Sequence, residues 1–268
     1  MKNNYIANID KQIKSAMLLA SIFGSLLLPS VANAFPVYAQ QAYENPREAT
    51  GRIVCANCHL AQKPTEIEVP QGVLPDTVFE AVVDIPYDLS VKQVTGDGTK
   101  GPLNVGAVMI LPEGFKLAPK ERLNDELKKA TEGVVISPYS DSKQNILVVG
   151  PISGNEHQKI VFPILAPNPA ENRDVHFIKY PIFVGANRGR GQVQPTGEKS
   201  NNTIYTSPVE GQIVKVESTD KLTTFTINSK SGDAITVKVP VGPDIIVKEG
   251  DSLKADQQLT IDPNVGGF

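Results

Sequence analysis

Short runs of apolar residues, many of them alternating with polar ones, follow one another along most of the chain. Proline and glycine separate these runs, and this pattern predicts short β-strands joined by turns. Pro163 and Pro181 interrupt two of the runs, which indicates strand edges, bends or bulges at those positions. In the first part of the chain the predicted strands are residues 78–85, 107–111, 145–149, 159–165 and 175–184.

Helix signals are scarce in the sequence. Residues 119–130 are the best candidate, because Pro119 suits a first helical turn and Gly133 follows the last one. A second, short helix is expected over residues 43–50.

A change of composition over residues 188–202 separates a second block of strands from the first. The separating residues are rich in glycine and have few large apolar side chains, which is typical of a loop. The second block alternates well and is typical of a small barrel or sandwich, as also found in biotinyl and lipoyl carriers. A carrier would need a modifiable lysine on an exposed hairpin, but Lys230 lacks the expected flanking residues, so a structural hairpin is favoured. The predicted strands of this block are residues 209–216, 223–227, 234–239 and 245–247, with a turn at 248–253.

The first 34 residues are typical of a secretion signal. Lysines precede a mostly apolar run over residues 13–28, and small residues at 32–34 suit a signal peptidase. The apolar core is short for a bilayer span, and an uncleaved N-terminal anchor is the alternative. Cleavage after Ala34 would make Phe35 the first residue of the mature protein.

Composition and charge narrow the class of protein. The chain is 40% hydrophobic and 21% charged, which is typical of a globular protein and not of a disordered one. Its formal net charge is −3, so nucleic acid is not expected as a partner.

The only two cysteines of the chain lie in the sequence Cys55-Ala56-Asn57-Cys58-His59. This C-x-x-C-H spacing is the attachment motif of a c-type haem: two thioether links hold the porphyrin and the histidine lies beneath the iron as an axial ligand. The motif therefore predicts one covalently bound haem and one-electron transfer.

Other chemistry at these cysteines is less well supported. A zinc site would need two further ligands, and no second C-x-x-C or H-x-H pair occurs. A thioredoxin-like redox site would need a βαβ context, which a strand-rich sequence does not provide. A disulfide between two cysteines only three positions apart would close a very small loop, so it would stabilise the fold little through loop entropy.

Four groups are candidates for the second axial position on the iron. Met109, the only methionine after residue 34, lies in an apolar run where a core residue is the simpler interpretation. His157 lies in a polar loop and is expected to be solvated, whereas His176 alternates within a predicted strand and is expected to be half-buried. The fourth group is the α-amino group that Phe35 would carry after cleavage, because a metal can displace a proton whose pKa is about 8. The pattern alone does not choose among them.

Several stretches of the chain resemble one family, cytochrome f. The cysteine motif and the residues before it match the start of the mature family members, and further matches extend to the last residue. The matching stretches are residues 36–41, 44–61, 101–108, 111–115, 187–192, 200–202 and 264–268.

The resemblance implies that His59 is one axial ligand and that the mature N-terminal amine, here on Phe35, is the other. One haem c would be bound covalently by Cys55 and Cys58. Members commonly begin with tyrosine, but the ligand is a backbone amine, so phenylalanine is not expected to remove it.

The resemblance also assigns roles to other side chains near the haem. Gln194 stands where many members carry an aromatic residue, which puts that haem contact in doubt. Without the resemblance, the polar side chains would be interpreted as turn or cap residues; with it, a buried water chain is expected. Positions that pack around the haem are Pro36, Tyr38, Pro151 and Pro195, and those of the water chain are Gln93, Asn187, Gln192, Asn202 and Asn264.

Family members dock plastocyanin or a soluble cytochrome through a basic patch. Lys92, Lys100 and Lys221 match its positions, and Lys215 lies nearby in the sequence. Thr99 stands where a plant-type member has lysine, so we expect a thinned patch and modest electrostatic steering. The alternative is that these lysines are scattered and solvated.

The resemblance implies a mainly β fold: a large fibronectin-like sandwich that carries the haem, with a small β domain inserted. The expected limits are a signal peptide at residues 1–34, the large domain at 35–202, the small domain at 203–262 and a return to the large domain at 263–268. Family members continue into a C-terminal membrane-spanning helix soon after this point, so the expectation is a chain that ends before its anchor.

The expected function follows from the same resemblance. The chain would be the haem subunit of the photosynthetic cytochrome bf complex, an electron carrier and not an enzyme. Its haem domain would lie on the lumenal side of a thylakoid and pass electrons from the Rieske iron–sulfur protein to plastocyanin or a soluble cytochrome. The rival is a haem enzyme with an open sixth coordination site.

Overall fold

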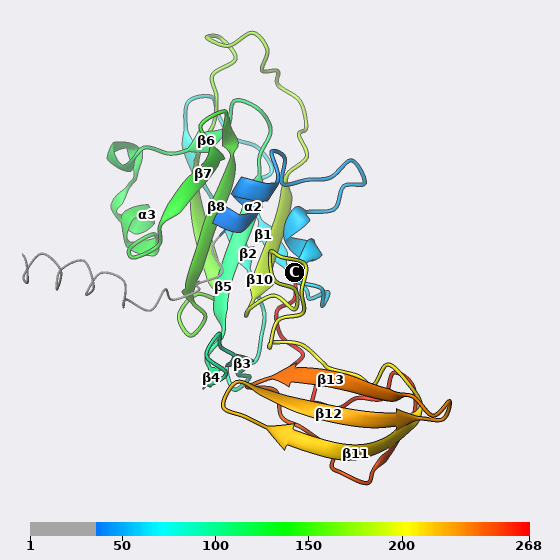
Figure 1. The fold of residues 1–268 in the computed structure, drawn as a ribbon. Coiled ribbons are helices and arrows are strands. Elements are labelled where there is room, and N and C mark those ends of the chain that lie inside the picture. The colour runs from blue at the N-terminus through cyan, green and yellow to red at the C-terminus, as the bar shows by residue number, and fades with distance from the viewer. Residues whose placement is uncertain (1–35) are drawn as a thin grey trace, which may run out of the picture. The chain divides into compact units, whose positions relative to one another are not determined.

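The computed structural model describes residues 36–268, which form a mainly antiparallel β structure (Figure 1). This confirms the predicted fold class. The predicted signal peptide and Phe35 lie outside the described residues.

Two four-stranded antiparallel sheets make up the larger part of the structure. The first has the order β1-β2-β9-β6, and the second has the order β10-β5-β8-β7. Their bounds are β1 (Glu66–Glu68), β2 (Val78–Asp84), β5 (Asn104–Ile110), β6 (Lys116–Leu117), β7 (Ile136–Ser140), β8 (Lys143–Ser153), β9 (Lys159–Leu165) and β10 (Phe183–Arg188).

The core of this part is built by alternate residues of both sheets, as the period-two pattern requires. In the first sheet, Ala81 and Val83 of β2 are fully buried and pair with Phe162 and Ile160 of β9. In the second sheet, Met109 of β5 is fully buried in the same cluster. The two sheets therefore form a sandwich that shares one apolar core.

A third antiparallel sheet forms a separate core. Its order is β13-β12-β11-β14, from β11 (Gly211–Ser218), β12 (Leu222–Ser229), β13 (Ala234–Pro240) and β14 (Ser252–Leu253). Phe225 and Ile227 of β12 are completely buried in this core. The predicted strand at 245–247 forms only an isolated bridge between Ile245 and Thr260.

A two-stranded hairpin contacts the third sheet. It consists of β3 (Gln93–Val94) and β4 (Lys100–Gly101). The Asn201 side-chain amide donates to the Thr95 carbonyl of the hairpin at 2.9 Å and to the Val241 carbonyl after β13 at 3.2 Å. One buried amide thus joins the hairpin to the end of the third sheet.

The helix predicted over residues 119–130 is interrupted. A 3₁₀ turn, η2 (Lys120–Arg122), is followed by α3 (Asp125–Ala130), with Asn124 in an extended conformation between them. The Asn124 side chain accepts a hydrogen bond from the Leu127 N–H at 2.8 Å. Asparagine starts a new helix here as an N-cap, which competes with continuing the earlier turn.

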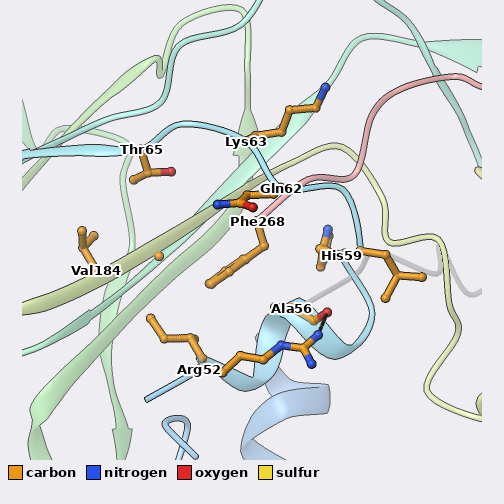
Figure 2. Close-up of a pocket in the computed structure, with 11 residues that line it drawn as sticks. Arg52, Ala56, His59, Gln62, Lys63, Thr65, Val184 and Phe268 are labelled. Atoms are coloured by element: carbon orange, nitrogen blue, oxygen red, sulfur yellow. Dashed lines mark hydrogen bonds between the residues drawn. The ribbon is translucent and has the colours of Figure 1, made fainter. Parts of the chain in front are cut away.

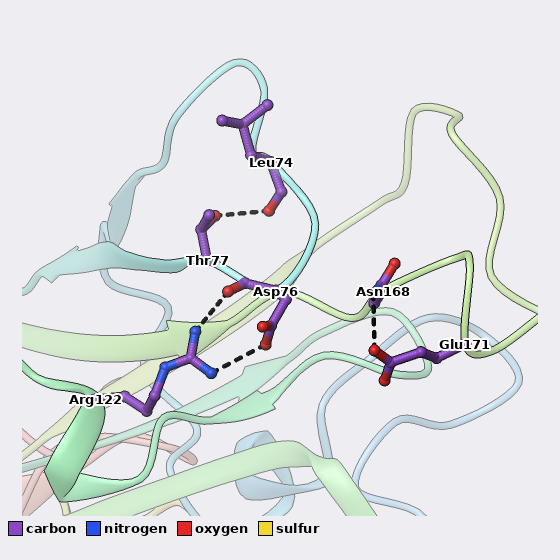
Figure 3. Close-up of polar contacts among 6 residues, drawn as sticks. All are labelled: Leu74, Asp76, Thr77, Arg122, Asn168 and Glu171. Atoms are coloured by element: carbon purple, nitrogen blue, oxygen red, sulfur yellow. Dashed lines mark hydrogen bonds and ion pairs between the residues drawn. The ribbon is translucent and has the colours of Figure 1, made fainter.

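The 3₁₀ turn η2 is held to the loop before β2. Arg122 forms an ion pair with the Asp76 carboxylate at 3.0 Å and also donates to the Asp76 carbonyl (Figure 3). In the long loop after β9, Asn168 donates to Glu171 at 3.0 Å.

The short helix predicted over residues 43–50 is wrong. The structure instead has α2 (Val37–Ala42), and Tyr43 is already extended with φ −133°. Proline at position 46 disfavours helical geometry in the residue before it, so the helix ends earlier in the chain.

The strand predicted over residues 175–184 is also largely wrong, because only its last two residues belong to β10. His176, Phe177 and Ile178 lie exposed in the loop after β9. Apolar residues are not always buried. Here β5, the strand that pairs with β10, has partners only from Phe183 onward, so the residues before it have no neighbouring strand.

Pro163 lies inside a sheet and not at its edge. The Pro163 carbonyl accepts from the Ala118 N–H at 2.9 Å, just beyond the end of β6. In an antiparallel strand the N–H and the carbonyl of one residue point to the same neighbour, so proline removes only the reciprocal bond to Ala118. The pairing of β6 with β9 ends at this position.

We expect Phe225→Ala to destabilise the protein by about 3–5 kcal/mol, since it removes a fully buried aromatic side chain from the third sheet's core. Phe177→Ala is the matched control: Phe177 is 78% exposed, so a change within about 0.5 kcal/mol is expected. Urea unfolding of both variants measures the difference. Equal losses would contradict the separate core.

Candidate functional site

The Cys-x-x-Cys-His segment folds as one tight turn. Its first part is the 3₁₀ helix η1 (Val54–Asn57), and the Cys55 carbonyl accepts the N–H groups of Cys58 at 3.2 Å and His59 at 3.0 Å. Both cysteines are free thiols and half-buried. Burial raises the pKa of Cys55 to about 12 and also raises that of Cys58, so both side chains are protonated thiols at neutral pH.

The His59 ring is oriented by a carbonyl from the other end of the chain. Its Nδ1 lies 3.0 Å from the Gly266 carbonyl oxygen, which accepts a hydrogen bond only if Nδ1 carries the proton. Burial lowers the pKa of His59 to about 4, so the ring is neutral at physiological pH. The lone pair is then on Nε2, the arrangement of a metal-ligating histidine whose tautomer is fixed by a backbone acceptor.

A pocket opens beside this histidine (Figure 2). Ala56 and His59 line it from the motif, and Val184 and Gly185 line it from β10. Figure 2 shows the Phe268 ring in the middle of these residues; a methyl group at Gly185 would overlap that ring. Polar and apolar side chains both line this pocket, and neither cysteine is among them. The two reduced thiols and the neutral imidazole of the motif turn are themselves the groups that attach a c-type haem.

Gln192 binds the residues on either side of the motif's contact with the C-terminal segment, Leu60 and Val265. Its side-chain oxygen accepts from the Leu60 N–H at 2.9 Å, and its amide donates to the Val265 carbonyl. The Gln192 backbone N–H donates to the Cys58 carbonyl at 2.8 Å. One glutamine thus joins the motif to the last residues of the chain, a contact that no local pattern in the sequence indicates.

Helix α2 is attached to the second sheet beside the motif. The buried Tyr139 hydroxyl of β7 lies 2.7 Å from the Ala39 carbonyl and 2.6 Å from the Tyr43 carbonyl. Burial, with smaller effects of Cys55 and Tyr43, raises the pKa of Tyr139 to about 12, so the hydroxyl keeps its proton. Ala39 and Cys55 pack against the same apolar cluster, which contains Ile53 and Tyr139. No local pattern in the sequence marks Tyr139 for this role.

Three of the polar side chains expected in a water chain are buried close together. The Gln93 side chain accepts from the Arg190 N–H at 2.7 Å, and the Asn202 amide donates to the Arg190 carbonyl at 2.7 Å. Gln93 and Asn202 thereby bind the same backbone unit, and Gln192 follows two residues later. These three side chains form a polar belt along the segment after β10: Gln192 binds the Leu60 N–H next to the motif, and Gln93 belongs to β3 of the hairpin.

The other two expected members lie differently. The Asn187 amide donates to the Gly189 carbonyl at 3.3 Å, next to this belt. Asn264 is exposed and accepts from the Lys63 ammonium at 2.6 Å.

Arg188 of β10 is an unexpected buried cation. It is 3% exposed, and its Nη2 donates to the Pro64 carbonyl and to the Thr65 hydroxyl. Among the described residues its Nε and Nη1 have no hydrogen-bond partner. Buried donors of this kind are normally satisfied by ordered water.

The side-chain candidates for the second axial position lie away from the pocket. Met109 is fully buried in the core of the sandwich. His157 binds the Ser153 carbonyl through Nδ1 at 2.8 Å, and His176 lies in an exposed loop instead of the predicted strand. The α-amino group proposed at Phe35 lies outside the described residues.

The residues expected to pack around the haem are not among those that line the pocket. Tyr38 is 44% exposed on α2, and Pro36 immediately precedes that helix. Pro151 lies in β8, whereas Pro195 and the neighbouring Gln194 are exposed.

The three lysines expected to dock a partner gather at one place. Lys92 and Lys100 belong to the β3–β4 hairpin region, and the Lys221 carbonyl accepts from Val241, which packs on the hairpin at Gly98. Lys100 forms an ion pair with Asp244 at 2.6 Å.

Acidic groups accompany these lysines. Asp97, in the same hairpin, accepts hydrogen bonds from Thr95 and Thr99 that lower its pKa to about 2. Lys215 is paired with Glu217 at 2.9 Å. The patch is therefore exposed but partly neutralised.

Comparisons with known proteins cover the described chain almost completely. A family model described as apocytochrome F, N-terminal, matches residues 35–189, and one described as apocytochrome F, C-terminal, matches residues 201–268. A protein named cytochrome f from Rhodomonas salina is 73% identical over 269 residues, which are 100% of this chain and 85% of the relative.

Relatives from other organisms carry the same name. Cytochrome f from Guillardia theta is 76% identical over 237 residues, 88% of this chain and 74% of the relative. Cytochrome f from Synechococcus elongatus is 57% identical over 257 residues, 95% of this chain and 83% of the relative.

Within residues 36–268, no helix has the length and apolar character needed to cross a bilayer.

We expect Gln192→Leu to cost about 2 kcal/mol of folding stability, because it leaves the buried Val265 carbonyl and the Leu60 N–H without their partner. Gln212→Leu is the matched control, because the exposed Gln212 also donates to a carbonyl, that of Gly250 at 3.0 Å. Urea unfolding should show a change within about 0.5 kcal/mol for the control. Similar losses for both would contradict the role given to Gln192.

Proposed function

Because this chain belongs to the cytochrome f family of photosynthetic electron-transfer haem proteins, we propose that it carries single electrons from the Rieske iron–sulfur protein to plastocyanin or a soluble c-type cytochrome. The observation that carries the proposal is the motif turn, with two free thiols and a histidine whose Nδ1 faces the Gly266 carbonyl. The protein is an electron-transfer subunit and not an enzyme, as the family membership establishes.

In this proposal the chain itself holds the cofactor. Cys55 and Cys58 would form the two thioether links, and His59 Nε2 would be one axial ligand. The α-amino group of Phe35, freed by cleavage after Ala34, would be the other. A haem c supplies one-electron chemistry when bound, and the protein fixes its ligands and its exposure to solvent.

The proposed domain limits follow the separate cores. Residues 35–202 with 263–268 would form the large haem domain, and residues 203–262 the small one. The proposal is supported by the third sheet's own core and by the return of the chain to the motif, where Phe268 N–H donates to the Ala61 carbonyl at 2.9 Å.

We also propose that the polar belt holds ordered water. Gln93 and Asn202 bind the Arg190 backbone in the segment that follows β10, and Gln192 binds the Leu60 N–H and the Val265 carbonyl. Arg188 has two buried donors without a partner among the described residues. Water would complete these hydrogen bonds. The resemblance to the family implies that this water has either a structural or a proton-conducting role.

The location follows from the family. Cytochrome f proteins belong to the cytochrome bf complex of photosynthetic membranes. We propose that the haem domain of this chain lies on the lumenal side of a thylakoid and contacts the Rieske protein and other subunits there.

The first test uses the protein expressed with its signal and loaded with haem. We expect a pyridine haemochrome spectrum of two thioether links, an N-terminus at Phe35, and a ferrous spectrum unchanged by carbon monoxide. A haem enzyme with an open sixth site would bind carbon monoxide rapidly, and this result would overturn the carrier function.

Two variants distinguish loss of a thioether link from a change in the protein core. Cys58→Ala should leave one thioether link and shift the haemochrome maximum, whereas Met109→Leu should leave all spectra unchanged because Met109 lies in the sandwich core. A mature N-terminus other than Phe35 would contradict the proposed amine ligand while leaving covalent attachment intact.

The second test addresses docking. Lys92→Gln should slow electron transfer to an acidic plastocyanin roughly twofold at low ionic strength, because an exposed charge near the contact steers encounter. Asp244→Asn should speed it, since it releases Lys100 from its ion pair. Stopped-flow rates over a salt series measure both effects, which should vanish at high salt.

Lys129→Gln on α3 is the control, because it makes the same change in net charge far from the hairpin in sequence. If Lys129→Gln slows the reaction as much as Lys92→Gln, the lysine cluster is not the docking surface.

A further inference from the structure

Helix α2 is held in place by one buried side chain of β7. The Tyr139 hydroxyl has a single proton to donate, and it faces the carbonyls of Ala39 and Tyr43 together. Tyr139 is 3% exposed, so these bonds are shielded from water.

A second hydrogen bond joins α2 and Tyr139, this time with the helix as the donor. The Gln40 side-chain amide donates to the Tyr139 backbone carbonyl at 2.8 Å. Tyr139 thus contacts the middle and the end of α2. None of the helix's own residues is fully buried, and only the partly buried Ala39 packs on the apolar cluster.

The attached helix begins close to the proposed ligand. Val37 is the first residue of α2, two positions after Phe35. A chain of two residues reaches at most about 7 Å. Any position that Phe35 takes is therefore limited by where the start of α2 is fixed.

The fastening is also next to the haem-attachment motif. Tyr139, Cys55 and Ala39 belong to one apolar cluster. Asn57 donates to the Tyr43 hydroxyl at 3.2 Å, so the end of α2 contacts the motif turn directly.

We propose that Tyr139 is a positioning residue for the N-terminal amine: by fixing α2 against β7 it holds the amine of Phe35 at the sixth coordination position. This inference rests on the proposed function, in which that amine is the ligand. Tyr139 itself touches neither the iron nor the porphyrin in this role.

The physical reason is that a helix of six residues, none of them fully buried, is not stable by itself. Without the hydroxyl, α2 would open more often, and each opening would take the amine away from the iron. A thioether-bound haem would remain attached throughout, because the links through Cys55 and Cys58 are covalent.

The experiment compares Tyr139→Phe with the unchanged holoprotein. Amide hydrogen exchange at Gln40 and Tyr43, whose N–H groups bond within the helix at 3.0 and 2.9 Å, should accelerate roughly five- to tenfold. Haem content and thioether number should be unchanged. The ferrous form should now bind carbon monoxide, and the ferric form should show a high-spin fraction that the parent lacks.

Tyr205→Phe is the matched control. Tyr205 is a buried tyrosine of the third sheet's core whose hydroxyl donates to the Ser200 carbonyl at 3.1 Å. It should change neither carbon monoxide binding nor exchange in α2. Gln40→Met removes the second bond and should act in the same direction as Tyr139→Phe, and it serves as the test if Tyr139→Phe fails to fold.

The outcomes distinguish the two proposals. Faster exchange in α2 with no carbon monoxide binding or spin change would overturn the positioning role and leave the carrier function intact. Carbon monoxide binding by the unchanged protein would overturn the proposed function itself. Equal effects of Tyr205→Phe and Tyr139→Phe would assign the change to general destabilisation and overturn the inference.

Discussion

The hydrogen bond between His59 Nδ1 and the Gly266 carbonyl joins residues 207 positions apart, and the arrangement of the site depends on it. It fixes the protonated nitrogen of the ring and therefore which nitrogen can bind a metal. The bond requires the chain to return to the motif after the third sheet. The backbone pairing of Gly266 with Arg188 at 2.7 Å secures that return.

Around this bond, the site is made by segments that are individually weak. The motif is one 3₁₀ turn, α2 has six residues, and the last segment has no regular strand. Buried polar side chains hold them together: Gln192 joins the motif to residue 265, and Tyr139 joins α2 to β7. A cofactor site needs ligands held rigidly, and here side-chain hydrogen bonds to backbone carbonyls provide the rigidity that long elements would otherwise give.

Much of the fold could be predicted because strand patterning is local. Residues 78–85 and 159–165 alternate or run apolar, and both became core strands of the sandwich. The failures occurred where a local signal depended on distant partners. Residues 175–184 have apolar side chains but no strand beside them before Phe183. Residues 119–130 have a helical face, but Asn124 caps a new helix within it.

The sequence by itself determined the chemistry of attachment, because two thiols and an imidazole at C-x-x-C-H spacing meet within a single turn of chain. It also indicated the family, since the matching stretches run from Pro36 to Phe268. Only the tertiary structure decided which His59 nitrogen is free, that Met109 lies in the sandwich core away from His59, and how α2 is held against β7. Those features are hydrogen bonds and packing contacts between segments brought together by sheet register, and no local pattern encodes such contacts.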